Sequence, residues 1–262
     1  MIIDFHTHAF PDGLAERAIK KMHISSGLFP HTDGTVDGLR RLMRHDGVDL
    51  AVILPVATNP KKHRHINDFA VTCRGNGVLS FGSVHPDAPD VLDELDRIHA
   101  MGFKGIKFHP EYQGFTVDDE KMKPIYRKIS ELGLITVFHV GPDFSYHPPY
   151  HGTAKQMLGA LKWLDSPVVA AHWGGIDKAE EALSTLSGIP QLYLDTALGY
   201  GTNVRTFVHE FIDTFGADHI LFGSDTPWHP PEWELRLFET LNLDPETQEA
   251  IFSGNAKRLL KL

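Results

Sequence analysis

Eight short apolar, β-branched runs recur along the 262-residue chain, and this repetition restricts its possible folds most strongly. Each run is followed by a loop and a stretch with helical amphipathicity, which is the pattern of parallel strands joined by crossover helices. The predicted strands are 1–8, 50–57, 78–84, 103–109, 134–140, 167–172, 191–196 and 219–225. The predicted helices include 36–45, 66–74, 90–101, 118–132, 153–163, 178–186, 204–215 and 232–240. Eight units of roughly 30 residues predict an α/β fold, a (β/α)8 TIM barrel.

A doubly wound open sheet fits the sequence less well than a barrel. Such a sheet needs fewer strands, and its dinucleotide-binding form has a glycine fingerprint after the first strand, where this chain has Thr7-His8-Ala9-Phe10. No linker rich in Pro, Ser or Gly divides the sequence, so we predict one domain over residues 1–262. The long first connection, 9–49, should hold more than one helix and part of the active-site cover. Residues 244–262 should form a closing pair of short helices.

The charge balance excludes several classes of partner. The chain has 25 Lys and Arg against 34 Asp and Glu, a net charge of −9, and no basic run. Nucleic acids and anionic membranes are therefore poor partners, and a small-molecule substrate is expected, with a homo-oligomer compatible with the sequence. No run approaches the roughly 18 apolar residues of a membrane span. A single cysteine, Cys73, and a start at Met1 without a signal-peptide pattern predict a cytoplasmic location.

The positions of the histidines indicate function better than their number, 17. In a TIM barrel the carboxyl ends of the strands form the active site. The first predicted strand ends in Asp4-Phe5-His6-Thr7-His8, where alternation places His6 and His8 on the inward face. The fifth, sixth and eighth strands end near His139, His172 and Asp225.

Imidazoles and a carboxylate that meet at one barrel mouth suit a divalent metal ion. Zinc fits this donor set best, with manganese, iron or cobalt as alternatives, and an open coordination position would hold water. Any one strand-end histidine is more often a structural residue than a ligand. The coincidence of metal-capable residues on four strand ends is what predicts a metal site.

These motifs as a set resemble the amidohydrolase superfamily. The stretches Ile3–His8 and Phe222–Trp228, together with His139 and His172, resemble most closely its amidohydrolase-related branch, which also contains the non-oxidative decarboxylase of 2-amino-3-carboxymuconate semialdehyde. Asn255–Leu259 is similar to that branch's usual ending. The resemblance covers essentially the whole chain. It implies that His6, His8, His139 and Asp225 hold the ion, and that His172 is a ligand of a second ion or a catalytic proton donor.

The fourth strand leaves the number of ions, one or two, open. Alternation places Lys107, His109 and Glu111 on one face, with His109 expected beside the site. In two-metal relatives a carbamylated lysine or a glutamate from this strand bridges the ions, so Lys107 or Glu111 could play that part. Our first choice for a second ion is Glu111 with His172. The alternative is that Lys107 is a buried, paired lysine and Glu111 an ordinary loop acid.

The ligand set predicts a metal-dependent hydrolase. A bound divalent ion lowers the pKa of water from about 15.7 towards roughly 7 and polarises a carbonyl oxygen. Asp225 is the natural base, and His172 would stabilise the oxyanion or donate a proton. We expect attack on an ester, lactone or amide of a small carboxylated or cyclic substrate. Aromatic and histidine side chains in 143–151, Trp173 and Trp228 are candidates to face it.

Three other functions remain open. Non-oxidative decarboxylation of an aromatic or unsaturated acid is the main alternative. It requires a cationic side chain that binds the substrate carboxylate. Arg205 is a candidate, although it is as easily a solvated helix residue. The short chain leaves little room for extended loops, which favours hydrolysis. A phosphoesterase of the polymerase-and-histidinol-phosphatase type would end in Asp-x-His, unlike Gly223-Ser224-Asp225. A non-catalytic metal-binding protein is the weakest alternative.

Overall fold

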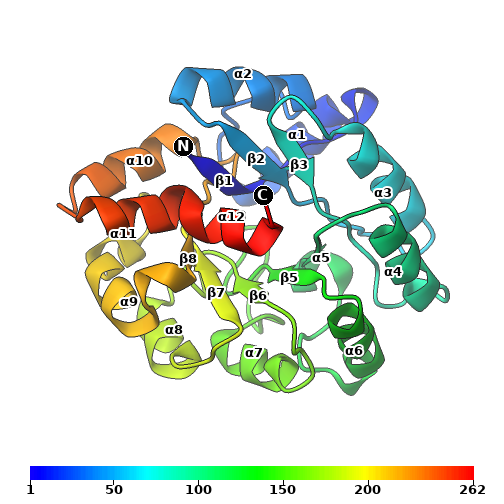
Figure 1. The fold of residues 1–262 in the computed structure, drawn as a ribbon. Helices are drawn as coiled ribbons and strands as arrows, with labels where there is room; N and C mark the ends of the chain where they lie inside the picture. Colours follow the sequence, from blue (N-terminus) through cyan, green and yellow to red (C-terminus); the bar gives the residue numbers. More distant parts are fainter.

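The computed structural model describes residues 1–262 and contains eight parallel strands at the predicted places (Figure 1). Three of them form one sheet in the order β1 (Ile3–Thr7), β2 (Leu50–Ile53) and β3 (Val78–Ser80). The other five form a second sheet in chain order: β4 (Gly105–Phe108), β5 (Ile135–Phe138), β6 (Val168–Ala170), β7 (Leu192–Asp195) and β8 (Ile220–Leu221). The strands are shorter than predicted, because the apolar runs continue into the loops at their ends.

Backbone hydrogen bonds join the two sheets at both seams. At one seam Thr7 bridges Thr226, and the N–H of Phe5 donates to the carbonyl of Phe222 at 2.8 Å. At the other, Gly82 bridges Ile106. Glycine is required at Gly105 beside this second seam, because a Cβ there would overlap the ring of Phe81. The fold is therefore the predicted TIM barrel.

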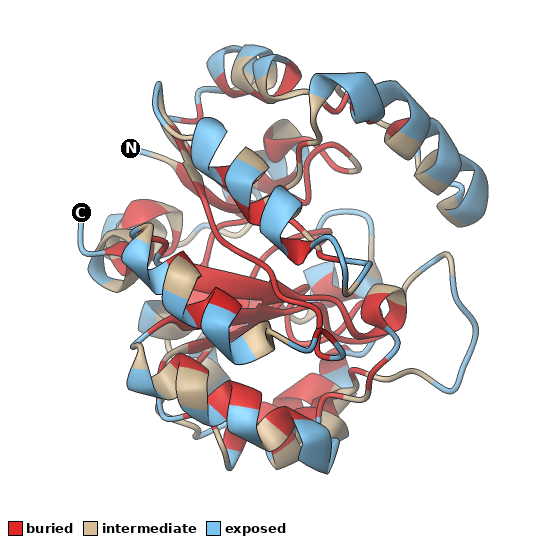
Figure 2. Ribbon diagram, turned by 90° about the vertical axis from the view of Figure 1, so that its right-hand side faces the viewer, coloured by how far each residue is buried: buried red, intermediate tan, exposed pale blue.

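A ring of helices surrounds the strands, and the helices are buried on the side that faces the strands and exposed on the other (Figure 2). The helices are α1 (Asp12–Ser26), α2 (Val36–Asp46), α3 (His63–Thr72), α4 (Val91–Ala100), α5 (Pro110–Gln113), α6 (Lys123–Glu131), α7 (Ala154–Leu161), α8 (Ala179–Leu186), α9 (Val208–Phe215) and α10 (Pro231–Glu239). As expected, the first connection holds two of them, α1 and α2. None of the helices is both long enough and apolar enough to cross a membrane.

The core has two layers, as the barrel geometry requires. Phe5, Val52 and Val137 belong to a buried cluster inside the barrel, and a larger cluster fills the space between strands and helices. The chain ends in α11 (Pro245–Glu249), a π-helical turn and α12 (Asn255–Leu260). Asn255 ties this closing segment to the barrel, since its Nδ2 donates to the carbonyls of Ala217 and Ile220, each at 2.7 Å.

Candidate active site

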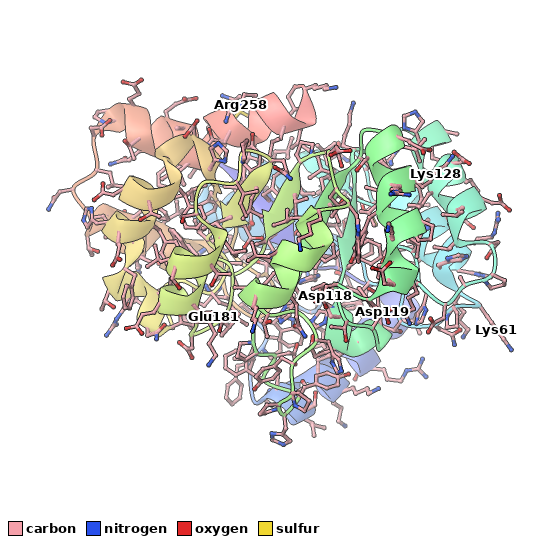
Figure 3. The ribbon with its side chains drawn as sticks, turned by 90° about the horizontal axis from the view of Figure 1, so that it is seen from below. Lys61, Asp118, Asp119, Lys128, Glu181 and Arg258 are labelled. Atoms are coloured by element: carbon pink, nitrogen blue, oxygen red, sulfur yellow. The ribbon has the colours of Figure 1, made fainter.

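A cavity of about 370 Å³ lies at the carboxyl ends of the strands, and half of its 28 lining residues are hydrophobic. The polar residues among them include His6, His8, Lys107, His109, His139, Asp143, His172 and Asp225. Helix α1 and the β5–α7 loop lie side by side over this end of the barrel (Figure 3), where the hydroxyls of Ser25 and Ser145 are 2.9 Å apart. The predicted catalytic end of the barrel is thus a covered cavity with a largely apolar surface, into which several polar side chains project.

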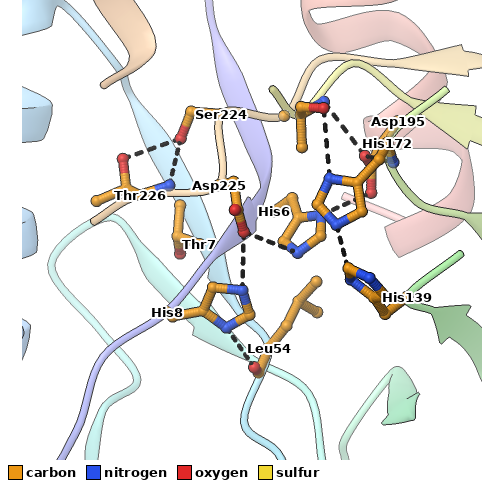
Figure 4. Close-up of polar contacts among 12 residues, drawn as sticks. His6, Thr7, His8, Leu54, His139, His172, Asp195, Ser224, Asp225 and Thr226 are labelled. Carbon is orange, nitrogen blue, oxygen red and sulfur yellow. Dashed lines mark hydrogen bonds and ion pairs between the residues drawn. The ribbon is translucent and has the colours of Figure 1, made fainter. Parts of the chain in front are cut away.

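His6, His8 and Asp225 form a group of possible metal ligands in this cavity (Figure 4). Oδ1 of Asp225 lies 3.0 Å from Nε2 of His8 and 3.4 Å from Nε2 of His6. The other ring nitrogen of each histidine has an acceptor: His8 Nδ1 donates to the carbonyl of Leu54 at 2.9 Å, and His6 Nδ1 donates to Asp195 at 2.8 Å. Both Nε2 atoms therefore carry lone pairs that point towards the same carboxylate oxygen.

This donor set fits a divalent metal ion. Tetrahedral ligands at the usual zinc distances lie roughly 3.3 Å from one another, close to the 3.0 and 3.4 Å that separate Asp225 Oδ1 from the two histidine nitrogens. Metal-bound histidines generally donate their other ring N–H to a carboxylate or a carbonyl, which fixes the tautomer. Asp195 and the carbonyl of Leu54 supply these two acceptors. The arrangement thus supplies three ligands and their orienting partners together.

The local backbone explains how Asp225 reaches this place. Asp225 has a φ of +79°, a left-handed conformation that aspartate and asparagine tolerate better than most residues. Its N–H donates to the carbonyl of His6 at 2.9 Å. The preceding Ser224 is held by Asp4, whose carboxylate accepts from the backbone N–H at 2.9 Å and from the hydroxyl at 2.6 Å. Strand β1 therefore carries His6, leads directly to His8 and also positions Asp225.

His139 and His172 adjoin this group and form a chain of hydrogen bonds. His172 Nδ1 lies 3.4 Å from the carbonyl of Ala197, which can only accept, so this nitrogen carries the proton. Neutral His172 then accepts at Nε2 from His139 Nδ1, 3.0 Å away. His139 Nε2 is left with a lone pair, buried and without a partner. The rings of His6 and His172 lie 4.9 Å apart, so all four predicted histidines share one cavity with Asp225.

Burial determines the charge of these groups. It lowers the pKa of His6, His139 and His172 well below the usual value, which keeps the imidazoles neutral, the form that ligates metals. Burial also raises the pKa of Asp225. It lowers the pKa of Lys107 to about 8, and the Lys107 amine donates to His6 Nε2 at 3.3 Å. Lys107 thus lies at the centre of the histidine group, on the inward face of β4 as predicted.

Sequence reasoning overlooked Asp195, which orients two histidines. Its Oδ2 accepts from His6 Nδ1, and its Oδ1 accepts from the backbone N–H of His172 at 2.8 Å. Asp195 is completely buried at the end of β7. The strand-end criterion that singled out Asp225 applies equally to Asp195, so the signal was present in the sequence.

Replacing Asp195 with asparagine is expected to weaken metal affinity by about 10- to 100-fold, because asparagine cannot hold His6 in the same tautomer with the same strength. Competition with a chromogenic chelator measures the dissociation constant. Asp177→Asn, which changes an acid outside the cavity lining, is the control. An unchanged affinity in the Asp195 variant would contradict this role.

Glu111 does not join the group, contrary to the expectation for a second ion. Strand β4 ends at Phe108 and helix α5 begins at Pro110, so alternation no longer governs the direction of the Glu111 side chain. Glu111 is absent from the cavity lining, and its Oε1 accepts from the backbone N–H of His151 at 2.6 Å. Its position is that of a buried acid that holds the β5–α7 loop.

We therefore expect Glu111→Gln to leave the metal content of the protein unchanged, since glutamine keeps the acceptor for His151. Elemental analysis of the purified variant beside the wild-type chain measures this. Loss of a metal equivalent in the variant would restore Glu111 as a ligand.

Of the other residues predicted to contact the substrate, some line the cavity and some do not. Trp228 lines the cavity, whereas Trp173 is buried and donates its ring N–H to the carbonyl of Thr196 at 3.0 Å. Arg205 is exposed and does not line the cavity. The cavity has a cationic side chain that the sequence did not single out, Lys21 of α1.

Comparisons with known proteins agree with this geometry. The family model described as Amidohydrolase matches residues 3–262. No curated protein sequence gives a significant match. The family match supports a metal-dependent reaction.

Solved structures resemble the chain over nearly its whole length. An uncharacterized TIM-barrel protein from Bordetella bronchiseptica has a TM-score of 0.77 at 22% identity, covering 99% of this chain and 98% of that one. The 5-carboxyvanillate decarboxylase from Sphingomonas paucimobilis has a TM-score of 0.74 at 14% identity, with coverages of 100% and 99%. A Pseudomonas putida protein provisionally named a 2-pyrone-4,6-dicarboxylic acid hydrolase has a TM-score of 0.68 at 17% identity, with coverages of 99% and 97%. These likenesses establish the fold, and the family match with the metal-capable cavity leads to one conclusion: the chain is an enzyme that belongs to the amidohydrolase family.

Proposed function

We propose that the protein is a metal-dependent hydrolase that cleaves an ester, lactone or amide bond in a small cyclic or carboxylated molecule. The observation that carries this proposal is the convergence of His6 Nε2 and His8 Nε2 on Asp225 Oδ1 inside a covered cavity. His6, His8 and Asp225 would hold the ion, with His139 as a further ligand whose free Nε2 is buried nearby. Zinc suits this nitrogen-rich set best.

The bound ion would supply a more acidic water and polarise the carbonyl oxygen of the substrate. Asp225 contacts the two histidines through Oδ1, which leaves Oδ2 to accept a proton from the attacking water and pass it to the leaving group. His172 lines the same cavity, where its neutral ring would stabilise the negative charge that develops on the carbonyl oxygen by donating a hydrogen bond. The apolar walls and the α1 cover exclude bulk water, which strengthens these interactions.

Product analysis across a panel of lactones, esters and amides tests the proposal. Hydrolysis in ¹⁸O-labelled water should place one heavy oxygen in the acid product, detected by mass spectrometry. Asp218→Asn, an exposed acid before β8, is the matched control and should keep full activity. The absence of label from every product would contradict hydrolysis.

Decarboxylation is the second candidate, and Lys107 is the observation that favours it. Its amine lines the cavity beside His6 without an acidic ion-pair partner, so it could bind a substrate carboxylate. The relative from Sphingomonas paucimobilis is named as a decarboxylase. Release of labelled carbon dioxide from ¹³C-carboxyl-labelled aromatic acids, with no ¹⁸O entering the product, would establish this reaction in place of hydrolysis.

A further inference from the structure

Asp143 presents a second carboxylate to the cavity, and neither the metal group nor the proposed mechanism uses it. It lies in the β5–α7 loop, lines the cavity together with His109, and its side chain is 12% exposed. The proposed ion is held around Asp225, whereas Asp143 belongs to a second group of possible metal ligands with His109 and His139, and it shares only His139 with the proposed ligand set. The cavity therefore has a second carboxylate away from Asp225.

Neighbouring groups hold this carboxylate in a fixed orientation. Asp143 Oδ1 accepts from the backbone N–H of Ser145 at 2.7 Å, and its Oδ2 lies 3.2 Å from His109 Nε2. His109 Nδ1 accepts from the backbone N–H of Tyr112, so in neutral His109 the proton is on Nε2, the nitrogen that faces Asp143. The His109 ring is stacked on that of His139, 4.1 Å away at 12°, which restricts its rotation. Asp143 is thus preorganised before any ligand arrives.

The contacts of Asp143 leave part of its accepting capacity unused. A carboxylate offers about four lone-pair sites; the Ser145 N–H occupies one, and His109 contacts the carboxylate at ion-pair distance. No lysine or arginine pairs with Asp143; His109 is its only ion-pair partner. A ligand carboxylate beside this group would be repelled, whereas a hydroxyl or an amino group would form a charge-assisted hydrogen bond.

We propose that Asp143 is a specificity-determining residue that recognises a hydroxyl or amino donor on the substrate. The substrate class is then a small, largely apolar molecule with a reactive carbonyl at one end and a hydrogen-bond donor at the other. This inference rests on the proposed function to the extent that the same cavity is the substrate site. His109 acts through Asp143 and is a positioning residue.

Binding of ligands that cannot be hydrolysed tests this inference apart from catalysis. The probes are 1-tetralone, a neutral bicyclic ketone, and its 5-, 6- and 7-hydroxy derivatives, titrated into the full-length, zinc-loaded protein by isothermal calorimetry. We expect at least one hydroxy isomer to bind about tenfold more tightly than 1-tetralone, as one hydrogen bond to a charged group allows. In Asp143→Asn and Asp143→Ala this preference should fall below about twofold.

Two variants of Asp143 are used because the alanine variant leaves His109 Nε2 without its ion-pair partner, whereas the asparagine variant keeps the shape of the side chain. Asp87→Asn, an exposed acid paired with Lys121 outside the cavity lining, should keep the full preference. The inference is overturned if the wild-type protein shows no preference, including no detectable binding of any probe, or if the preference persists in both Asp143 variants. A protein that hydrolyses the lactone panel but shows no preference retains the proposed function and loses this inference.

Discussion

Replacing Asp225 with asparagine should lower kcat by about 10²- to 10⁴-fold, the usual contribution of a general base. The variant keeps the size of the side chain, and asparagine tolerates the φ of +79° at this position. The backbone contacts of the loop, including the hydrogen bond from the Asp225 N–H to the His6 carbonyl, should persist. Initial rates on the best substrate of the panel measure the loss, and circular dichroism verifies the fold.

The same substitution separates a catalytic from a structural role for Asp225. Asp218→Asn changes an exposed acid close in sequence and should leave kcat within about twofold, as expected of a surface substitution. Full activity of the metal-loaded Asp225 variant would contradict the assignment of Asp225 as the general base. A variant that unfolds would instead show that the carboxylate serves stability.

Removing the metal with a chelator should abolish turnover and lower thermal stability together. Loss of several kcal/mol of transition-state stabilisation corresponds to a fall in rate of at least about 100-fold. An ion present at 1,000 times its dissociation constant stabilises the folded state by about 4 kcal/mol, so chelation should lower Tm clearly. Activity assays and calorimetry before and after dialysis measure both effects, and readdition of zinc, manganese, iron or cobalt identifies the ion that restores them.

His8→Ala is the informative control for chelation. It removes one candidate ligand and should make Tm almost insensitive to the chelator. The His8 Nε2 contact with Asp225 is lost in this variant, while the His6 contact with Asp195 remains. An unaltered Tm and full activity in chelated wild-type protein would refute metal dependence.

Local patterns in the sequence predicted the barrel and several of the residues that the cavity brings together. Period-two alternation along the first strand predicted His6 and His8 on one inward face, and both line the cavity, although Phe5 also packs inside the barrel beside a register shift of β1. Strand ends also placed His139, His172 and Asp225 at the correct end of the barrel. These inferences succeeded because a strand's side-chain direction depends on its own few residues.

The same rule failed where a strand stopped early. Alternation was extended past Phe108 to Glu111, but the chain enters helix α5 at Pro110, and Glu111 turns to the loop at His151. Asp195 was not predicted as a site residue although it lies near the end of a predicted strand, because its role depends on its contact with His6. A pattern of residue types cannot show that partner.

The sequence by itself determined the order of strands and helices, and with it the end of the barrel at which chemistry takes place. Only the tertiary structure decided which groups meet there: His8 and Asp225, 217 positions apart, lie 3.0 Å from each other, and Asp143 is held by His109 of a different strand end. The physical reason is that strand direction follows from local sterics and burial, whereas ligand geometry, tautomers and unused acceptors depend on contacts between distant segments, which exist only after the barrel has closed.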